Sequence, residues 1–195
     1  MKKYIIISGV LFAFAITQKS SLNAQAFETG NNIVSAGYGA PNLNKALFKI
    51  YEDENEYSLK GYGPIHLKYE HAVSDRIGLG LSINHVASSM SYRNLNSYIY
   101  ELNYSSTKFN ARVNVHFASS DVFDAYWGIG AGYGTSTTKW TTGDPNSSNE
   151  SFSNPIPIGL EATLGARYFF SENIGLYAEI GLAKSIVQGG FSFKF

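Results

Sequence analysis

Apolar and polar positions alternate strictly along much of this chain, and the clearest stretch is Trp127–Gly134. There, Trp127, Ile129, Ala131 and Tyr133 alternate with Gly128, Gly130, Gly132 and Gly134. A period of two is the period of a β-strand. A dinucleotide-binding loop needs the spacing G-x-G-x-x-G and a helix after it, whereas a polar run rich in Ser, Thr and Asn follows here. The pattern therefore predicts a strand with one face almost free of side chains.

Seven further stretches alternate in the same way, which makes eight expected strands. They lie at residues 34–39, 65–70, 77–84, 109–117, 156–168, 174–182 and 187–195. The expected connections alternate in length. The long ones are 41–61, 87–104 and 136–155, and the short ones are 73–76, 119–124 and 170–173, followed by a short last connection at 183–186. Long loops at one end and short turns at the other are typical of outer-membrane barrels.

The composition of the two faces decides which one meets water. In a soluble β-sandwich or barrel the polar face would be outside, but here it consists largely of Gly, Ser, Thr and Asn with few charges. The apolar face carries aromatic residues beside the short turns, as an interfacial girdle does: Tyr69, Phe117, Trp127, Tyr168 and Phe195. We therefore expect an all-β fold, an eight-stranded antiparallel up-and-down transmembrane β-barrel. Its sheet must close, because every backbone group needs a partner in lipid.

The inward face of the expected barrel carries charges of both signs. They are Lys68, Glu70, Arg112, Glu161, Arg167, Glu179 and Lys194. Isolated buried charges are very unfavourable, so these side chains must pair. The interior of an eight-stranded barrel is just wide enough to be filled by side chains, and the glycine faces would make room for them. We expect a charge network that fills the lumen; an ion path or proton relay is the alternative.

The N-terminus has the features of a secretory signal peptide. Lys2 and Lys3 precede an apolar stretch too short to span a bilayer comfortably, and Ala24 and Ala26 form an A-x-A motif. The expected division is a signal peptide at 1–26, cut after Ala26 or after Ala24, and an outer-membrane β-barrel domain at 27–195. An N-terminal membrane anchor is the alternative.

Removing residues 1–26 changes the charge and narrows the partners. The removed part holds Lys2, Lys3 and Lys19 and no acidic residue, so the formal net charge falls from 0 to −3. A mildly acidic chain is a poor nucleic-acid binder. The chain has no cysteine, which excludes structural disulfides and lipid attachment through a cysteine.

The last nine residues, VQGGFSFKF, place aromatic residues at alternate positions: Phe191, Phe193 and Phe195. With this strand and the eight-strand pattern, residues 31–195 resemble the small eight-stranded outer-membrane barrels of Gram-negative bacteria, the family of OmpX and the OmpA transmembrane domain. The resemblance implies an outer-membrane location and a final strand read by the barrel-assembly machinery. It also implies contact with periplasmic chaperones, outer-membrane lipid and lipopolysaccharide. It implies no cofactor and no metal.

Two other motifs invite a chemical interpretation. His85 with Ser88 and Ser89 is reminiscent of the H-x-S pair of outer-membrane lipid A deacylases, but the spacing is H-x-x-S, so an interfacial histidine is the better interpretation. The run YEDENEY places Glu52, Asp53, Glu54 and Glu56 in the first long loop without the ligand spacing of a calcium loop. We expect a solvated acidic loop.

Three functions are compatible with these patterns. The first is a structural or surface-interaction barrel without catalysis, with a filled lumen and exposed loops, one of which carries Trp140. The second is a narrow channel for ions or small solutes, and the third is a lipid-modifying enzyme. The patterns identify no surface ligand or host receptor.

Overall fold

The structure is a computed structural model that describes residues 25–153 and 156–195. Most of the expected signal peptide, including Ala24, lies outside the described residues. The elements are β1 (Asn32–Ala40), α1 (Leu43–Phe48), the 3-10 helix η1 (Lys49–Tyr51), β2 (Asn55–Ser74), β3 (Ile77–Arg93), β4 (Ile99–Ser119), β5 (Phe123–Thr142), β6 (Glu150–Ser153), β7 (Ile158–Phe169), β8 (Ile174–Leu182) and β9 (Val187–Lys194). In this part of the chain, no helix combines the length and hydropathy needed to cross a membrane.

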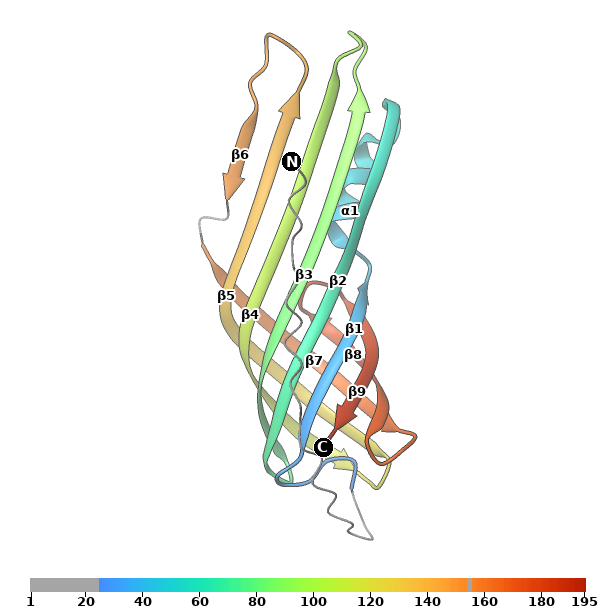
Figure 1. The fold of residues 1–195 in the computed structure, drawn as a ribbon, viewed down its shortest axis with the longest axis vertical. Coiled ribbons are helices and arrows are strands. Elements are labelled where there is room, and N and C mark those ends of the chain that lie inside the picture. The colour runs from blue at the N-terminus through green and yellow to red at the C-terminus, as the bar shows by residue number, and fades with distance from the viewer. Residues whose placement is uncertain (1–24, 154–155) are drawn as a thin grey trace, which may run out of the picture.

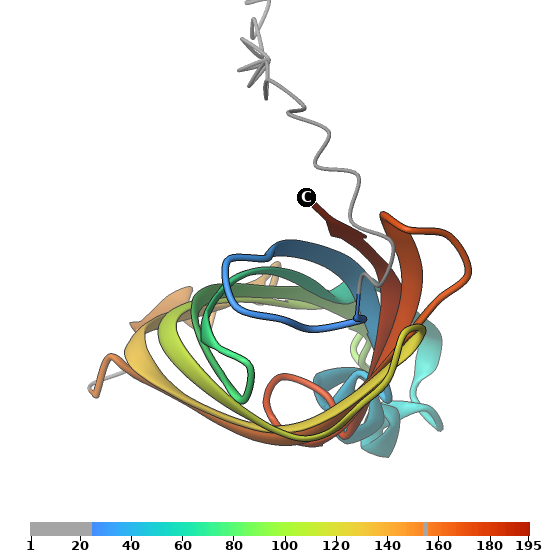
Figure 2. The ribbon, with the colours of Figure 1, turned by 90° about the horizontal axis from the view of Figure 1, so that it is seen from below.

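Eight of the strands close into a ring of antiparallel neighbours. β1 pairs with β2 on one side and with β9 on the other, and β5 pairs with both β4 and β7. The view from below shows the closed ring (Figure 2). β6 is the exception, because it pairs only with residues 137–140 of β5, above the point where β7 leaves that edge. The predicted eight-stranded up-and-down barrel is confirmed.

The two faces of the ring have the inverse polarity of a soluble barrel. On the outer face, Leu81, Ile129 and Leu160 are 59%, 64% and 60% exposed, whereas the inward Arg112 and Glu179 are 3% and 1% exposed. Along β4 the outward positions from residue 109 to 117 are all apolar. With a strand rise of about 3.4 Å and the usual tilt, this stretch spans roughly the 25 Å apolar band of outer-membrane barrels. The outer face thus matches lipid, and the polar groups fill the inside.

Four strands of the ring are much longer than its other four. β2, β3, β4 and β5 have 20, 17, 21 and 20 residues, whereas β1, β7, β8 and β9 have 9, 12, 9 and 8. The long strands therefore rise beyond the ring as an open sheet (Figure 1). We call this part, residues 55–62, 87–93, 99–105 and 135–142 together with β6, the upper sheet.

The upper sheet corrects the prediction of long loops at 87–104 and 136–155. Most of the described residues in these ranges are strand, and the short segments 94–98 and 143–149 connect β3 to β4 and β5 to β6. The outward apolar alternation of the ring ends there, but the backbone pairing continues from Lys60 through Ser89 and Asn103 to Lys139. The predicted long loop at 41–61 is also corrected: it ends where β2 begins at Asn55, and it holds α1 and η1.

Candidate functional site in the barrel lumen

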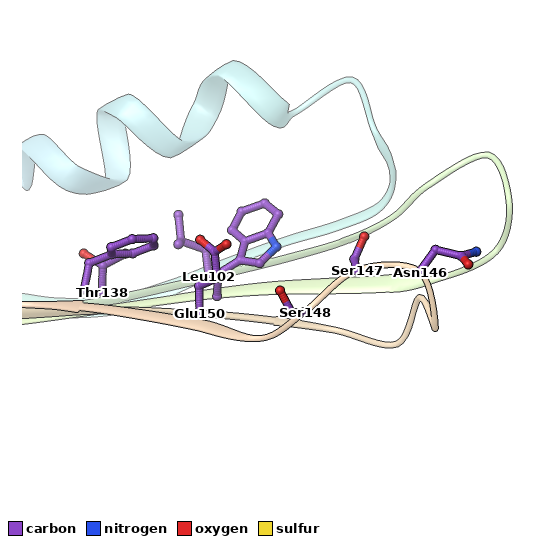
Figure 3. A pocket seen from close by; sticks show the side chains of 8 residues that line it. Leu102, Thr138, Asn146, Ser147, Ser148 and Glu150 are labelled. Atoms are coloured by element: carbon purple, nitrogen blue, oxygen red, sulfur yellow. The ribbon is translucent and has the colours of Figure 1, made fainter.

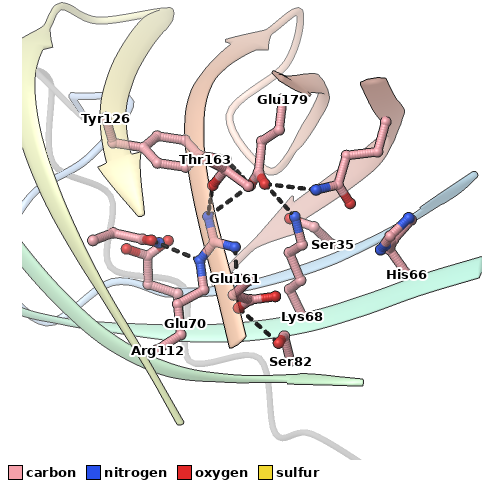
Figure 4. Close-up of polar contacts among 12 residues, drawn as sticks. Ser35, His66, Lys68, Glu70, Ser82, Arg112, Tyr126, Glu161, Thr163 and Glu179 are labelled. Carbon is pink, nitrogen blue, oxygen red and sulfur yellow. Dashed lines mark hydrogen bonds and ion pairs between the residues drawn. The ribbon is translucent and has the colours of Figure 1, made fainter. Parts of the chain in front are cut away.

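Glu179 on β8 is the centre of the polar network in the lumen. One carboxylate oxygen lies 2.6 Å from Lys68 Nζ and accepts a hydrogen bond from Gln188 at 2.9 Å. The other oxygen lies 3.0 Å from Arg112 Nη2 and accepts the Tyr126 hydroxyl at 2.8 Å. These partners come from strands on opposite sides of the ring, so one buried carboxylate ties the walls together (Figure 4).

Arg112 on β4 connects this group to a second carboxylate. Its guanidinium lies 3.3 Å from Glu161 on β7 and donates to Thr163 Oγ1 at 2.7 Å. Glu161 also accepts hydrogen bonds from Ser82 at 2.8 Å and Asn84 at 3.2 Å. The two cations and two carboxylates of this layer are all buried and are balanced in charge, which is the condition for keeping ions in a narrow interior.

A second layer lies closer to the short turns. Arg167 pairs with Glu70 and, at 3.3 Å, with Asp124. His116 bridges the same two carboxylates, with Nδ1 2.6 Å from Asp124 and Nε2 2.8 Å from Glu70. Tyr126 separates the two layers, since its ring lies 4.4 Å from the Arg167 guanidinium while its hydroxyl reaches Glu179.

The segment that precedes β1 closes the lumen at the turn end. The Phe27 ring stacks on the imidazole of His116 with centroids 3.4 Å apart, and Ala26 and Phe27 are fully buried. The Ala26 N–H donates to the Ser120 carbonyl at 2.8 Å, and Lys194 Nζ donates to the Gln25 carbonyl at 2.6 Å. Residues 25–27 thus form part of the folded barrel.

Thr29 fixes the same segment to the β2–β3 turn. Its backbone N–H and its hydroxyl donate to one oxygen of Asp75 at 3.0 and 2.5 Å. These hydrogen bonds stabilise the carboxylate and lower the pKa of Asp75 below its usual range.

The connection between β8 and β9 closes the other end of the lumen. Ser185 is 3% exposed and its hydroxyl lies 3.1 Å from Nε2 of His66, whose Nδ1 contacts Asn84 at 2.5 Å. Lys184 Nζ donates to the Ser106 hydroxyl on the facing wall. This short connection turns inward over the lumen, and it makes contacts with β2 and β4.

Glycines on the inner face make room for the charged side chains. A Cβ at Gly130 would lie 2.7 Å from Glu161 Oε1, and one at Gly165 would lie 2.5 Å from the Tyr126 ring. At Gly132 the nearest atom is instead the backbone carbonyl of Phe109, so this glycine permits close strand approach. The run of glycines in β5 serves both purposes.

The predicted lumen charges all have buried positions, and all but Lys194 join the two ion-pair layers. Lys194 contacts the Gln25 carbonyl and the Phe169 ring and makes no ion pair with a described carboxylate. The alternation pattern does not single out His66, His116, Asp124 or Tyr126. The two histidines and Tyr126 have the inward parity of the network, whereas Asp124 lies in a stretch that the pattern predicts as a turn.

The predicted outer-face residues point away from the lumen. Tyr69, Phe117, Trp127 and Tyr168 are 39%, 57%, 58% and 54% exposed, and the Phe117 and Trp127 rings lie 6.3 Å apart. In the final strand, Phe191 and Phe193 are 64% and 42% exposed, and the Phe193 ring lies 5.8 Å from that of Phe195.

The His85 motif has none of the geometry of a catalytic pair. Both imidazole nitrogens have other neighbours, Thr107 Oγ1 at 2.8 Å and the Tyr62 hydroxyl at 3.1 Å. Ser88 faces the inner side, where its hydroxyl contacts Asn42. Ser89 lies on the outer face, one row above the Tyr62–Ala87 pair.

The acidic residues of the predicted loop lie partly in a turn and partly in β2. Glu52, Asp53 and Glu54 follow η1 and are exposed apart from their turn contacts. Glu56 lies in β2 and pairs with Arg93 at 2.9 Å.

No family model and no curated protein sequence matches this chain. Solved structures with a similar fold include Ail, the attachment invasion locus protein of Yersinia pestis, with 16% identity and a TM-score of 0.48 over 86% of this chain and 99% of that one. The N-terminal β-barrel domain of OprF from Pseudomonas aeruginosa has 16% identity and a TM-score of 0.38, covering 86% and 98%. The outer membrane protein OprG of the same species has 13% identity and a TM-score of 0.43, covering 87% and 97%.

At these identities and TM-scores the comparisons carry no argument about function, and inferences about function rest on the residues of this chain. The strand number, the antiparallel order and the inverted polarity confirm the fold implied by the resemblance to OmpX and the OmpA transmembrane domain. This chain has the fold of the small eight-stranded outer-membrane β-barrels.

Proposed function

We propose that this protein is an outer-membrane barrel with a structural or surface-interaction role, without catalysis and without a conducting pore. The observation that carries the proposal is the filled lumen. Two ion-pair layers cross it, Phe27 closes it at the turn end, and Ser185 closes it at the other end. With the lumen occupied, the parts available to other molecules are the apolar outer face of the ring, called the belt below, and the upper sheet.

The alternative of a narrow channel requires these contacts to open. Every charge in the two layers has an opposite partner within 3.3 Å, and separating such a pair in a low-dielectric interior is strongly unfavourable. Continuous conduction is therefore disfavoured. The alternative of a lipid A-modifying enzyme is weaker still, because His85 has no serine or carboxylate partner within hydrogen-bonding distance among the described residues.

The proposed location determines the partners. A cleaved signal peptide would export the chain, periplasmic chaperones and the barrel-assembly machinery would fold it, and outer-membrane lipid and lipopolysaccharide would surround the belt. Phe191, Phe193 and Phe195 would form the assembly signal. No nucleic-acid partner, cofactor or metal is proposed.

Two measurements test the role together. Purified, refolded protein reconstituted in planar bilayers should produce no conductance steps under conditions where a general porin does. Lipopolysaccharide from cells that express the protein should keep all its acyl chains by mass spectrometry. Discrete conductance would establish the channel instead, and loss of an acyl chain would establish the enzyme.

Cysteine labelling of intact cells tests the orientation. The long-strand end should face the medium and the short turns the periplasm. A membrane-impermeant thiol reagent should modify Glu54→Cys and leave Ser171→Cys unmodified. The opposite pattern would reverse the proposed orientation.

A further inference from the structure

The inner face of the upper sheet is divided into a covered half and an open half. Over β2 and β3, the inward Val86 and Met90 are at most 1% exposed. The segment that contains α1 lies there. The Asn42 amide donates to Ser88, and Tyr51 stacks on Tyr92 with centroids 5.5 Å apart. This half is closed by the chain itself.

Over β4, β5 and β6 the same face is open and hollowed. The cross-strand row that begins at the buried Met90 continues through Leu102 and Trp140 to Glu150. Leu102, Trp140 and Glu150 line a cavity of about 500 Å³, within the range of sites for small ligands. Figure 3 shows the lining residues along one face of the sheet, with Asn146 and Ser147 on the β5–β6 hairpin.

The cavity has an apolar floor that is held in position. Trp140 is half-buried. The centroid of its indole lies 5.8 Å from the centroid of the Tyr100 ring and 6.5 Å from that of the Tyr92 ring. Phe152 on β6 pairs with Thr138 in the next row and is 58% exposed. An indole fixed by neighbouring rings is preorganised for stacking, so binding would not require it to lose further freedom.

The rim of the cavity is polar and lacks positive charge. Hydroxyls and an amide line it, from Thr138, Ser147, Ser148 and Asn146, and Glu150 supplies the single carboxylate. Neither lysine nor arginine is among its lining residues in the described part of the chain. No hydrogen bond or ion pair joins the Glu150 carboxylate to another described residue, so its oxygens remain acceptors for a ligand.

This combination fits one class of ligand. A pyranose ring has an apolar C–H face that can lie on an indole and a circumference of hydroxyls that donate to a carboxylate. An anionic sugar would bring its charge against Glu150 with no cation to compensate. We propose that the cavity binds a neutral saccharide, with the ring stacked on Trp140 and a hydroxyl donated to Glu150. The proposal rests on the surface role proposed above, because the site is accessible only if the upper sheet faces the medium.

Protein folded in detergent micelles is the material for the test. Fluorescently labelled protein is first applied to an array that holds neutral oligosaccharides and sulfated ones side by side. Neutral oligosaccharides should be retained and sulfated ones should not. The ligand retained best is then titrated by calorimetry. In the Trp127→Phe background, where Trp140 is the remaining tryptophan, the same ligand should change the fluorescence.

The variants locate the site. Trp140→Ala should weaken binding by at least about tenfold, as for a stacked aromatic anchor, and Glu150→Gln by about tenfold, as for a charged hydrogen-bond acceptor. Lys139→Gln, the adjacent residue on the opposite face of β5, is the matched control and should bind as the wild type does. Circular dichroism confirms that each variant is folded.

Several results would overturn the proposal. They are an array on which no neutral oligosaccharide retains the protein, sulfated oligosaccharides that retain it equally well, or a Trp140→Ala variant that binds the ligand with wild-type affinity. If the array is negative while the bilayers show no conductance and Glu54→Cys is labelled on cells, the saccharide site fails and the proposed function stands. Labelling of Ser171→Cys alone would reverse the proposed orientation and defeat the surface-interaction role, whatever the array shows.

Discussion

Four strands, β2 to β5, run through both the ring and the upper sheet, yet the polarity of the two regions is opposite. In the ring, β4 directs Arg112 inward and Val113 toward lipid. Further along, the inward residue is Leu102 and the outward one is Asn103. The change occurs near His85 and Thr107, which contact each other at 2.8 Å on the outer face. One strand thus carries two inverse patterns with an unbroken backbone register.

The reversal follows from what surrounds each face. In the ring the outer face meets lipid and the inner face holds paired charges, so the apolar groups must be outside. In the upper sheet both faces meet water, and burial comes from folding the first connection over the inner face, so the apolar groups gather there. The stability of the ring should therefore depend on charge pairing and lipid contact, and that of the upper sheet on ordinary apolar packing.

The largest effect should come from the lumen. Glu179→Ala leaves Lys68 and Arg112 without their shared carboxylate. Breaking a buried pair in this way costs on the order of 3–5 kcal/mol. Denaturant unfolding of micelle-folded protein should show this loss, whereas Glu150→Ala in the upper sheet should stay within about 0.5 kcal/mol of wild type. If the two variants unfolded at the same denaturant concentration, the lumen network would not stabilise the ring.

The next largest effect should distinguish an outward position in the ring from an outward position in the upper sheet. Leu164 lies in mid-strand between Trp127 and Ile180, and an arginine in the middle of the lipid belt costs roughly 2–4 kcal/mol. Leu164→Arg should therefore impair insertion into lipid vesicles. Asn103→Arg has the same outward parity but lies above the belt, and it should insert like wild type, as should the lumen variant Thr163→Ser. Equal insertion of Leu164→Arg and Asn103→Arg would remove the boundary between the two regions.

A smaller effect should be confined to the upper sheet. Tyr92 stacks on Tyr51 and Tyr100 with centroids 5.5 and 5.4 Å apart, and aromatic pairs contribute about 0.5–1.5 kcal/mol each. Tyr92→Ala should accelerate amide hydrogen exchange in residues 88–104 and leave exchange in residues 109–117 unchanged. Acceleration in both segments would show that the regions unfold as one unit.

The smallest effect should come from the segment before β1 that closes the lumen at the turn end. Since Gln25 and Ala26 make contacts with Lys194 and Ser120, we expect cleavage after Ala24, so that both residues remain. Their removal should cost about 0.5–1.5 kcal/mol for each of the two hydrogen bonds that are lost. Intact-mass measurement of protein purified from membranes should match a chain that begins at Gln25. A mass that matches a start at Phe27 would exclude a role for these two residues.

Strict alternation was enough to predict the ring and the inward direction of Arg112, Glu161 and Glu179. It could not predict their partners, because the contact between Glu179 and Lys68 depends on how far the strands are staggered around the closed barrel. The upper sheet was missed for a different reason. In β4 an alternation does continue, since Leu102 is inward and Asn103 outward, but its phase is the reverse of that in the ring. The facing segments 87–93 and 135–142 are rich in Ser and Thr, which is the composition of a loop. The Trp140 cavity needs both the hairpin and the register of β6, which composition does not reveal.

The central claim is that lipid, rather than water, surrounds the ring. It is tested most directly by refolding wild-type residues 25–195 in parallel in plain buffer, in detergent micelles and in lipid vesicles. Circular dichroism and gel filtration then report on the fold and the size of the particles. The exposed belt that includes Leu81, Ile129 and Leu160 predicts a folded β-barrel only with detergent or lipid, and aggregation in buffer alone. A monodisperse, folded monomer in plain buffer would contradict the account.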